Sequence, residues 1–427
     1  MLLSAKIWGH WVMVSEWPIV RIEDIAEKIA LGPFGSNIKA ETFVESGVPV
    51  ISGAHLHGIR VEDGVFNFVT EEHAERMKNS NVFRGDVIFT RAGNIGQVAY
   101  IPHNSQYERY VISPLRFYLR CDLSKADPVF ISYFFHSSEG QHKLLANASQ
   151  TGVPSIARPS SYLKTIELSL PPLKEQRAIS HILGTLDDRI ANLRQTNATL
   201  EAIAQALFKS WFVDFDGVPP EDMQESELGL IPKEWRVGTF GDVAEHPRRG
   251  VQPEEIESST PYIALEHMPR RCIALSDWGM AVGLESNKHE FKRGEILFGK
   301  LRPYFHKVGV APIDGVCSTD IVVITPKSPA WFGFVLAHAS SDPFVEYTNA
   351  GSTGTKMPRT SWREMSRYAV VLPPESIATA FNEQVQQMVE KIISNIHEVR
   401  TLAALRDTLL PKLISGKLRF HGRIHES

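Results

Sequence analysis

Cysteine is scarce in this chain. Three cysteines, Cys121, Cys272 and Cys317, are spread over 427 residues. An odd number at such wide spacing indicates neither a disulfide framework nor a zinc site. We therefore expect a protein of the reducing cytoplasm, without a structural metal.

Long apolar runs are missing as well. No stretch approaches the roughly 18 apolar residues of a membrane span. The N-terminal segment "MLLSAKIWGHWVM" has one lysine and no small-residue cleavage site, so it is a poor signal peptide. The sequence "MVSEWP" reads like the beginning of a domain, which makes Met13 an alternative start to Met1.

Catalytic motifs are absent. The dipeptides Gly299-Lys300 and Gly416-Lys417 are both followed by leucine, so neither belongs to a phosphate-binding loop. The chain also lacks G-x-G-x-x-G after a strand, H-E-x-x-H, G-x-S-x-G, paired CxxC, and the Asn-Pro-Pro-aromatic motif of amino-methyltransferases. These absences predict a chain that is not itself an enzyme.

The chain also lacks an excess of positive charge. The net charge is −4, and no segment forms a basic tail. Any contact with nucleic acid must therefore come from local clusters of basic residues on one face.

What the sequence does have is an internal repeat. "EWPIVRIEDIAE" from Glu16 matches "EWRVGTFGDVAE" from Glu234, and "FRGDVIF" matches "FKRGEILF". Further along, "NASQTG" matches "NAGSTG" and "LPPLKEQ" matches "LPPESIA", in the same order. Four matches in series indicate a tandem duplication, in which each half is a globular domain followed by a helix.

Each half ends in a stripe of mostly apolar residues that alternate in steps of four and three. The first stripe comprises Ile179, Leu183, Leu186, Ile190, Leu193, Asn197, Leu200, Ala204 and Leu207. The second repeats it at a constant offset of 202 residues: Phe381, Val385, Met388, Ile392, Asn395, Val399, Leu402, Arg406 and Leu409. A sustained 3.5-residue period predicts a coiled coil. A surface helix packed on its own domain would explain one such stripe, but two matched stripes favour pairing with each other.

The globular halves show the texture of β-rich α+β domains. "GDVIFTRAG", "GQVAYIP" and "GEILFGKLRPYFHKVGVAP" are β-prone runs bounded by glycine and proline, while "DPVFISYFFHSSEGQHKLL" has helical spacing. His136 and His338 recur within helical sequence, and we interpret them as helix-packing residues. The predicted domains are residues 1–172, a helix at 173–216, residues 217–374, and a helix with a tail at 375–427.

One weak nuclease-like pattern remains as an alternative. Asp277 precedes Glu290 and Lys292, and two carboxylates with a lysine can hold Mg²⁺ and a water. The aligned first copy has Asn81 and Phe83 instead, so a polar turn before a strand is the simpler interpretation.

Several polar loops carry side chains of the kinds that contact DNA in proteins, although any single one could be a solvated surface loop. "TRAGNIGQ" places polar groups among glycines, and "GKLRPYFHK" interleaves cations with aromatic rings. "EHPRRG", "MPRR", "GSTGTK" and "QTGVPSIAR" add further basic residues. Such side chains suit contacts to phosphates and base edges. The candidate DNA-binding residues are Arg91, Asn94, Gln97, Arg158, Arg248, Arg249, Lys300, Arg302, Tyr304, Lys307 and Lys356.

The stretch "LPPLKEQRAISHILGTLDDRIANLRQTNATLEAIAQALFKSWFVDFDGV" resembles the central region of specificity (S) subunits of type I restriction–modification systems. "LRDTLLPKLISGKLRF" resembles the second conserved block of that family, and "LFGKLRPYFHKVGVAP" and "GSTGTKM" look like parts of its target-recognition domains. With the duplication, the resemblance covers residues 16–420.

The resemblance implies two β-rich target-recognition domains that each read half of a split double-stranded DNA site. It implies two long helices that pair antiparallel as an intramolecular coiled coil with pseudo-twofold symmetry and dock two modification (methyltransferase) subunits. The helix from Glu175 to Trp211 would be roughly 55 Å long, which is about 16 base pairs of B-DNA. Methylation, ATP hydrolysis and cleavage, with S-adenosylmethionine, ATP and Mg²⁺, would belong to modification and restriction subunits. The chain itself would hold no cofactor.

The repeat also predicts the helix register. A pseudo-twofold axis brings Asn197 opposite Asn395, Trp211 opposite Phe381, and Leu186 opposite Arg406, whose charged head would then reach water. The predicted helix-pairing residues are Leu186, Leu193, Asn197, Leu200, Leu207, Ile392, Asn395, Val399 and Leu402. We also expect "LFKSWFVDF" and "LLPKLISGKL" to form exposed apolar patches that partner subunits cover. A coiled-coil scaffold without a DNA role remains a further alternative.

Overall fold

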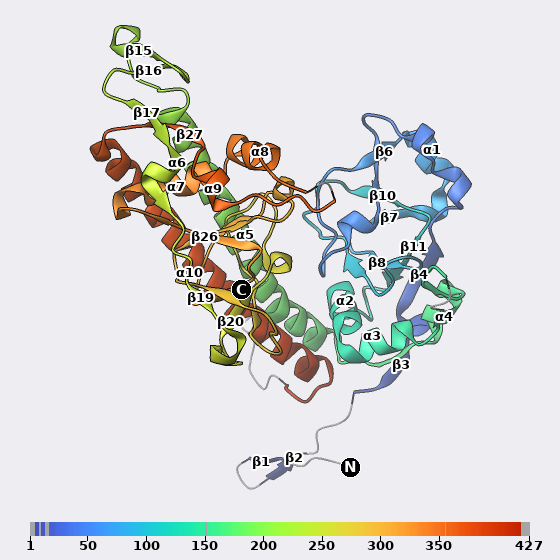
Figure 1. Cartoon of the computed structure of the whole chain (residues 1–427). Helices are drawn as coiled ribbons and strands as arrows, with labels where there is room; N and C mark the ends of the chain where they lie inside the picture. The colour runs from blue at the N-terminus through green and yellow to red at the C-terminus, as the bar shows by residue number, and fades with distance from the viewer. Residues whose placement is uncertain (1–4, 8–9, 13–16, 150–151, 355, 420–427) are drawn as a thin grey trace. The chain divides into compact units, whose positions relative to one another are not determined.

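The computed structural model describes residues 5–7, 10–12, 17–149, 152–354 and 356–419. Met13, the alternative start, lies outside them. The chain divides into two compact units, Met1–Asp187 with Ala404–Ser427, and the remaining Asp188–Ala403. Each unit contains one globular domain and one end of each long helix (Figure 1).

The first unit is built on two four-stranded sheets. One has the order β6-β5-β10-β7, with β5 and β10 parallel, and the other is the antiparallel sheet β4-β11-β8-β9. Their strands are β4 (Ala26–Leu31), β5 (Val48–Ile51), β6 (Asn67–Val69), β7 (Asn81–Phe83), β8 (Val87–Thr90), β9 (Val98–Tyr100), β10 (Arg109–Ile112) and β11 (Arg116–Cys121). Three two-stranded ladders complete the unit: β1 (Ala5–Ile7) with β2 (His10–Val12), β3 (Ile19–Arg21) with β14 (Glu167–Ser169), and β12 (Ala148–Ser149) with β13 (Ser155–Ile156).

Strand periodicity divides the apolar residues of this unit between two cores. Val87 and Phe89 of β8 join the core beneath the helices, whereas Ile88 joins the core between the sheets. Because both faces are covered, β8 is buried throughout and apolar up to its last residue, Thr90. The helices are α1 (Glu71–Arg76), α2 (Pro128–His136), α3 (Ser138–Leu145) and α4 (Pro159–Thr165), and α2 packs on β9.

The second unit repeats this topology. The sheet β18-β26-β23-β24 matches β4-β11-β8-β9, and β19-β22-β25-β20-β21 again contains one parallel pair, β20 with β25. Its strands are β17 (Arg236–Thr239), β18 (Ala244–Glu245), β19 (Gly250–Val251), β20 (Pro261–Ile263), β21 (Gly279–Met280), β22 (Lys288–Phe291), β23 (Ile296–Gly299), β24 (Val308–Val310), β25 (Gly315–Cys317), β26 (Ile321–Pro326) and β27 (Ala369–Leu372). The predicted tandem repeat is therefore confirmed.

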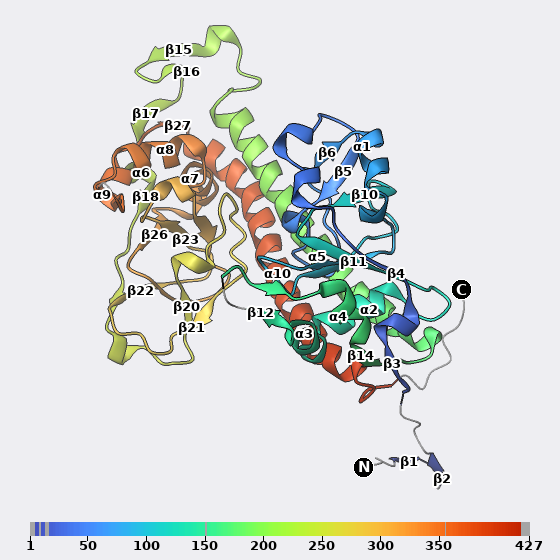
Figure 2. The same cartoon turned by 90° about the vertical axis from the view of Figure 1, so that its right-hand side faces the viewer.

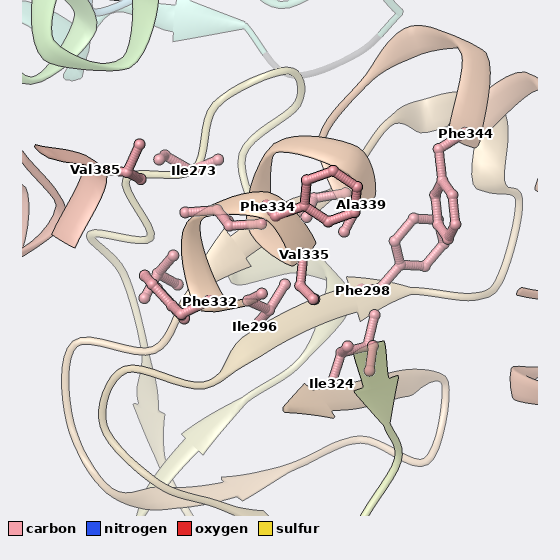
Figure 3. Close-up of a cluster of buried hydrophobic side chains, with 14 of the residues drawn as sticks. Ile273, Ile296, Phe298, Ile324, Phe332, Phe334, Val335, Ala339, Phe344 and Val385 are labelled. Atoms are coloured by element: carbon pink, nitrogen blue, oxygen red, sulfur yellow. The ribbon is translucent and has the colours of Figure 1, made fainter. Parts of the chain in front are cut away.

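Helices α6 (Phe240–Val243), α7 (Phe332–Ala339), α8 (Asp342–Ala350) and α9 (Trp362–Met365) complete the second domain. Figure 3 shows the core of this unit, in which Phe332 and Val335 of α7 lie over Ile296 of β23. His338 on α7 is half-buried, and desolvation lowers its pKa to about 3, so it packs as a neutral ring. A hairpin that the sequence did not predict, β15 (Met223–Ser226) with β16 (Gly229–Pro232), projects beyond β17 in Figure 1.

The two long helices are α5 (Leu173–Phe212) and α10 (Glu375–Ile414), each of 40 residues and about 60 Å long. Each begins directly after a Pro-Pro pair. All predicted helix-pairing residues are buried or half-buried.

The predicted register is confirmed within the second unit. The Asn395 side chain donates a hydrogen bond to the Asn197 side chain over 2.8 Å, and the rings of Trp211 and Phe381 lie 5.8 Å apart. Positions that rise along α5 meet positions that fall along α10, so the pair is antiparallel (Figure 2).

Arg406 is paired as well as partly exposed to solvent. Its Nη1 pairs with Asp187 over 2.7 Å and its Nη2 with Asp407 over 2.8 Å, and 30% of the side chain stays exposed.

One expectation about the helices was wrong, because the predicted apolar patches are mostly buried. Phe208 and Phe212 belong to the core of the second unit, and Leu413 and Ile414 belong to a core of the first. The apolar side chains at these helix ends are therefore buried in the cores of the chain's own domains.

No helix in the described part of the chain combines the length and apolar character that a membrane span requires.

Candidate nucleic-acid interface

The loop between β8 and β9 and the loop between β23 and β24 place a cation at equivalent positions. The Arg91 backbone N–H donates to Leu115 and its carbonyl accepts from Ile156, at 2.9 and 2.8 Å. Lys300 makes the corresponding bonds to Asp320 and Thr360, at 2.9 and 3.0 Å. The shared hydrogen-bond pattern identifies Arg91 and Lys300 as counterparts in the two domains.

The same loops approach a second basic segment. In the first domain, Ala92 bridges Ser155, so the segment that leads to Arg158 lies beside the loop. In the second domain, Leu301 bridges Arg359, in the segment that also carries Lys356. The fold thus brings together loops that are distant in sequence, as contact with one DNA duplex requires.

Backbone strain coincides with arginines. Among the described non-glycine residues with positive φ are Arg158 (45°), Arg248 (48°), Arg271 (52°) and Arg302 (52°). Left-handed backbone costs an L-residue of this kind on the order of 1 kcal/mol, and such strain clusters at functional sites. Three of these four arginines are predicted DNA-binding residues.

The aromatic loop of the second domain holds a cation–π cluster. Arg270 lies 4.2 Å from the centroid of the Phe305 ring and Arg302 lies 6.0 Å from it, while exposed Tyr304 packs against Phe305. Lys307 donates through Nζ to the Leu265 carbonyl. Burial, and then the charge of Arg270, lower the pKa of the Lys307 ammonium.

A further group of cations surrounds two histidines. Burial lowers the pKa of both His246 and His289, and the charges of Arg248 and Lys300 lower it further. Both rings therefore stay neutral beside the cations, and no carboxylate contributes to either shift.

The remaining predicted residues differ in exposure and in whether their polar groups already have partners within the chain. Asn94, Arg158, Arg248 and Lys356 are exposed. Gln97 is half-buried and accepts a hydrogen bond from Thr90 over 3.2 Å. The Arg249 guanidinium pairs with Glu295, so a contact to phosphate would compete with that carboxylate.

Nothing in the described part of the chain supports the nuclease-like pattern. Lys292 pairs with Asp314 at 3.6 Å, and no group of three or more histidine, cysteine or acidic side chains could hold a metal ion.

Sequence reasoning missed two buried side chains. Arg116 opens β11 and is buried, and Glu201 on α5 accepts the Ile273 N–H over 2.9 Å. Glu201 also lines a cavity of about 240 Å³ together with Cys272, His306 and Asp342. Neither residue belongs to a recognisable motif, and only the tertiary structure reveals them.

Over residues 14–202 the chain matches the sequence profile described as "Type I restriction modification DNA specificity domain". The chain is similar to the specificity subunits of type I restriction–modification systems. Specificity subunits of such systems are recognition subunits and not catalytic ones.

The similarity to known proteins extends over most of this chain. The Type I restriction enzyme MjaIX specificity subunit of Methanocaldococcus jannaschii is 26% identical over 425 residues, which cover 95% of this chain and 94% of that protein. The HindI specificity subunit of Haemophilus influenzae is 25% identical, over 78% of this chain and 87% of that protein. The crystal structure of a type I S subunit from M. genitalium shares the fold, with a TM-score of 0.60, 17% identity, and coverage of 93% of this chain and 96% of that chain.

Proposed function

We propose that this chain is a specificity subunit that recognises a bipartite double-stranded DNA site, with one half read by residues 1–172 and the other by residues 217–374. The helical segments 173–216 and 375–427 set the spacing between the halves. The chain then directs two modification subunits and, where present, restriction subunits to that site.

The observation that carries this proposal is the duplicated loop. Arg91 and Lys300 occupy equivalent positions with matching backbone hydrogen bonds, and each lies beside a second basic segment. Two copies of one recognition surface in a single chain suit a split site better than a continuous one. Cation-rich loops supply phosphate contacts, and their amide and guanidinium groups can read base edges.

The chemistry of modification and cleavage is assigned to the partners. S-adenosylmethionine, ATP and Mg²⁺ would bind in those subunits, and this chain would hold none of them. Three scattered free cysteines are consistent with a cytoplasmic location.

A domain exchange tests the proposal. Residues 1–172 are replaced by the same segment of a relative, and host DNA is sequenced for methylation with and without the gene. We expect one half of the methylated motif to change while the other half and the spacer stay the same. A change in both halves would contradict the two-domain reading. If wild-type protein binds all duplexes equally, the scaffold alternative is favoured.

A further inference from the structure

Arg116 is a buried cation at the end of a strand in the first domain. It opens β11 opposite Thr90, the last residue of β8, immediately before the loop that begins at Arg91. The residue is only 6% exposed. Its guanidinium lies against the turn at Gly53, because a methyl group on Gly53 would be 2.3 Å from Nη2. The same methyl group would be 3.8 Å from the side-chain oxygen of Gln97.

The guanidinium lacks an anionic partner. In the described part of the chain, its side-chain hydrogen bond is that from Nη1 to the Leu115 carbonyl at 2.9 Å, and it makes no ion pair. Its Nε is buried and has no hydrogen-bond acceptor. Burial lowers the pKa of Arg116, and no neighbouring charge of either sign offsets that effect. A buried, unpaired guanidinium is costly, because each unpaired donor forfeits its hydrogen bonds to water.

The second domain shows that the fold does not need this charge. The pair Arg116–Thr90 corresponds to Ile321–Gly299 in the matching sheet. Gly53 corresponds to Leu265, because each begins a short helical turn with the same hydrogen bond. In the first turn the Ser52 N–H donates to Nδ1 of His55, and in the second the Ala264 N–H donates to Nδ1 of His267. Leu265 lies against Gly299, since a methyl group placed on Gly299 would be 2.9 Å from Cδ2 of Leu265. An apolar arrangement therefore fills the equivalent place.

The neighbours of Arg116 suit a base edge better than a phosphate. Thr90 and Gln97 are neutral and polar, and the Thr90 hydroxyl donates to the Gln97 side-chain oxygen over 3.2 Å. Phosphate sites commonly gather several cations, whereas guanine offers O6 and N7 to a single arginine fork. We propose that Arg116 is a specificity-determining residue of the first domain, which binds a guanine edge with Gln97 beside it, and that the second domain lacks this contact. The inference rests on the proposed DNA-reading function.

The test is a selection from a library of randomised duplexes with the full-length chain in complex with its modification subunits. Wild type should yield a bipartite consensus. With Arg116→Met, we expect the preference for guanine at a single position of one half-site to fall about tenfold to a hundredfold. The other half-site should stay unchanged. The thermal stability of Arg116→Met should equal or exceed that of wild type, because the substitution removes a buried charge.

Two further variants keep the test decisive. Gly53→Ala retains the arginine but displaces it, and should weaken the same base preference even if Arg116→Met does not fold. Arg76→Met removes an exposed arginine of the same unit, 3.9 Å from Glu72, and should leave the consensus intact.

The overturning results are distinct. Uniform loss of affinity with an unchanged consensus would make Arg116 a phosphate contact, and unchanged affinity and consensus would make it a structural residue. Either result refutes the inference and leaves the proposed function standing. If wild type yields no consensus at all, the proposed function itself fails.

Discussion

The Asn395 side chain donates a hydrogen bond to the Asn197 side chain over 2.8 Å within the buried seam of α5 and α10. The two residues are separated by 198 positions in the chain. Their meeting determines the register of the antiparallel pair, because a slipped register would leave each amide in an apolar layer. The Asn395 Oδ1 atom is buried without a partner, so the contact contributes more to register than to stability.

Substitution of one asparagine should cost more than substitution of both. Asn197→Leu leaves the Asn395 amide unpaired, and we expect a loss of about 1–3 kcal/mol in the free energy of unfolding. The double variant with Asn395→Leu should recover much of that loss. Urea unfolding of the two single variants and the double variant measures the coupling directly. Additive losses would show that the two side chains do not act as a pair.

The helix pair could be predicted because its information is periodic and duplicated. A heptad stripe identifies the buried face, and a constant offset relates Ile179 to Phe381 and every later pair. Symmetry then leaves one register to test, and the Asn197–Asn395 contact confirms it. The strands followed from short apolar runs such as the one at β8, which is buried on both faces.

The state of individual loop side chains could not be predicted. Arg249 pairs with Glu295, which is 46 positions away, and Lys307 bonds to the Leu265 carbonyl, 42 positions away. Composition cannot distinguish these engaged cations from exposed Arg248. The burial of Arg116 depends likewise on Gly53, which is distant in sequence.

Glu201 predicts a pH effect on stability. Burial raises the pKa of this carboxyl above its usual value, although the Ile273 N–H and Cys272 oppose the shift. A raised folded-state pKa means that the stabilisation from proton binding is full below the unfolded value and is lost as the pH rises through the folded value. Glu201→Gln keeps an acceptor for Ile273 and cannot ionise, so we expect it to be more stable than wild type at neutral pH.

Thermal unfolding from acid to neutral pH measures this effect. The difference between Glu201→Gln and wild type should grow as the pH rises above about 4.5. Glu201→Ala is the control, because it leaves the Ile273 N–H without an acceptor and should cost about 1–3 kcal/mol at acid pH. Alanine cannot ionise either, so this cost should shrink as the pH rises while the gap between the alanine and glutamine variants stays constant. A constant difference between the glutamine variant and wild type would show that Glu201 titrates normally.

Salt dependence should separate exposed cations from engaged ones. If Arg248 and Lys356 each contact a phosphate, replacing both with alanine should reduce the slope of log K against log salt concentration by about 1.8. Replacing Arg302 and Lys307 should reduce it by less, because the Lys307 ammonium is already bonded to the Leu265 carbonyl. Binding to a duplex of fixed sequence over a salt series gives both slopes. Equal reductions would mean that Lys307 leaves its carbonyl to contact DNA.

Arg248 should show a conflict between stability and DNA binding. Its φ of 48° lies in the left-handed region, where glycine carries no Cβ penalty. Arg248→Gly should therefore raise the free energy of unfolding by about 1 kcal/mol relative to Arg248→Ala, which keeps the strained backbone. Both variants remove the same charge, so both should weaken DNA binding about equally. Urea unfolding of the two variants measures the effect of the backbone on stability, and DNA titration measures the effect of the lost charge on binding. If alanine binds DNA as wild type does, the strained arginine is not a DNA contact, and the coincidence of left-handed backbone with arginines in these loops loses its functional explanation.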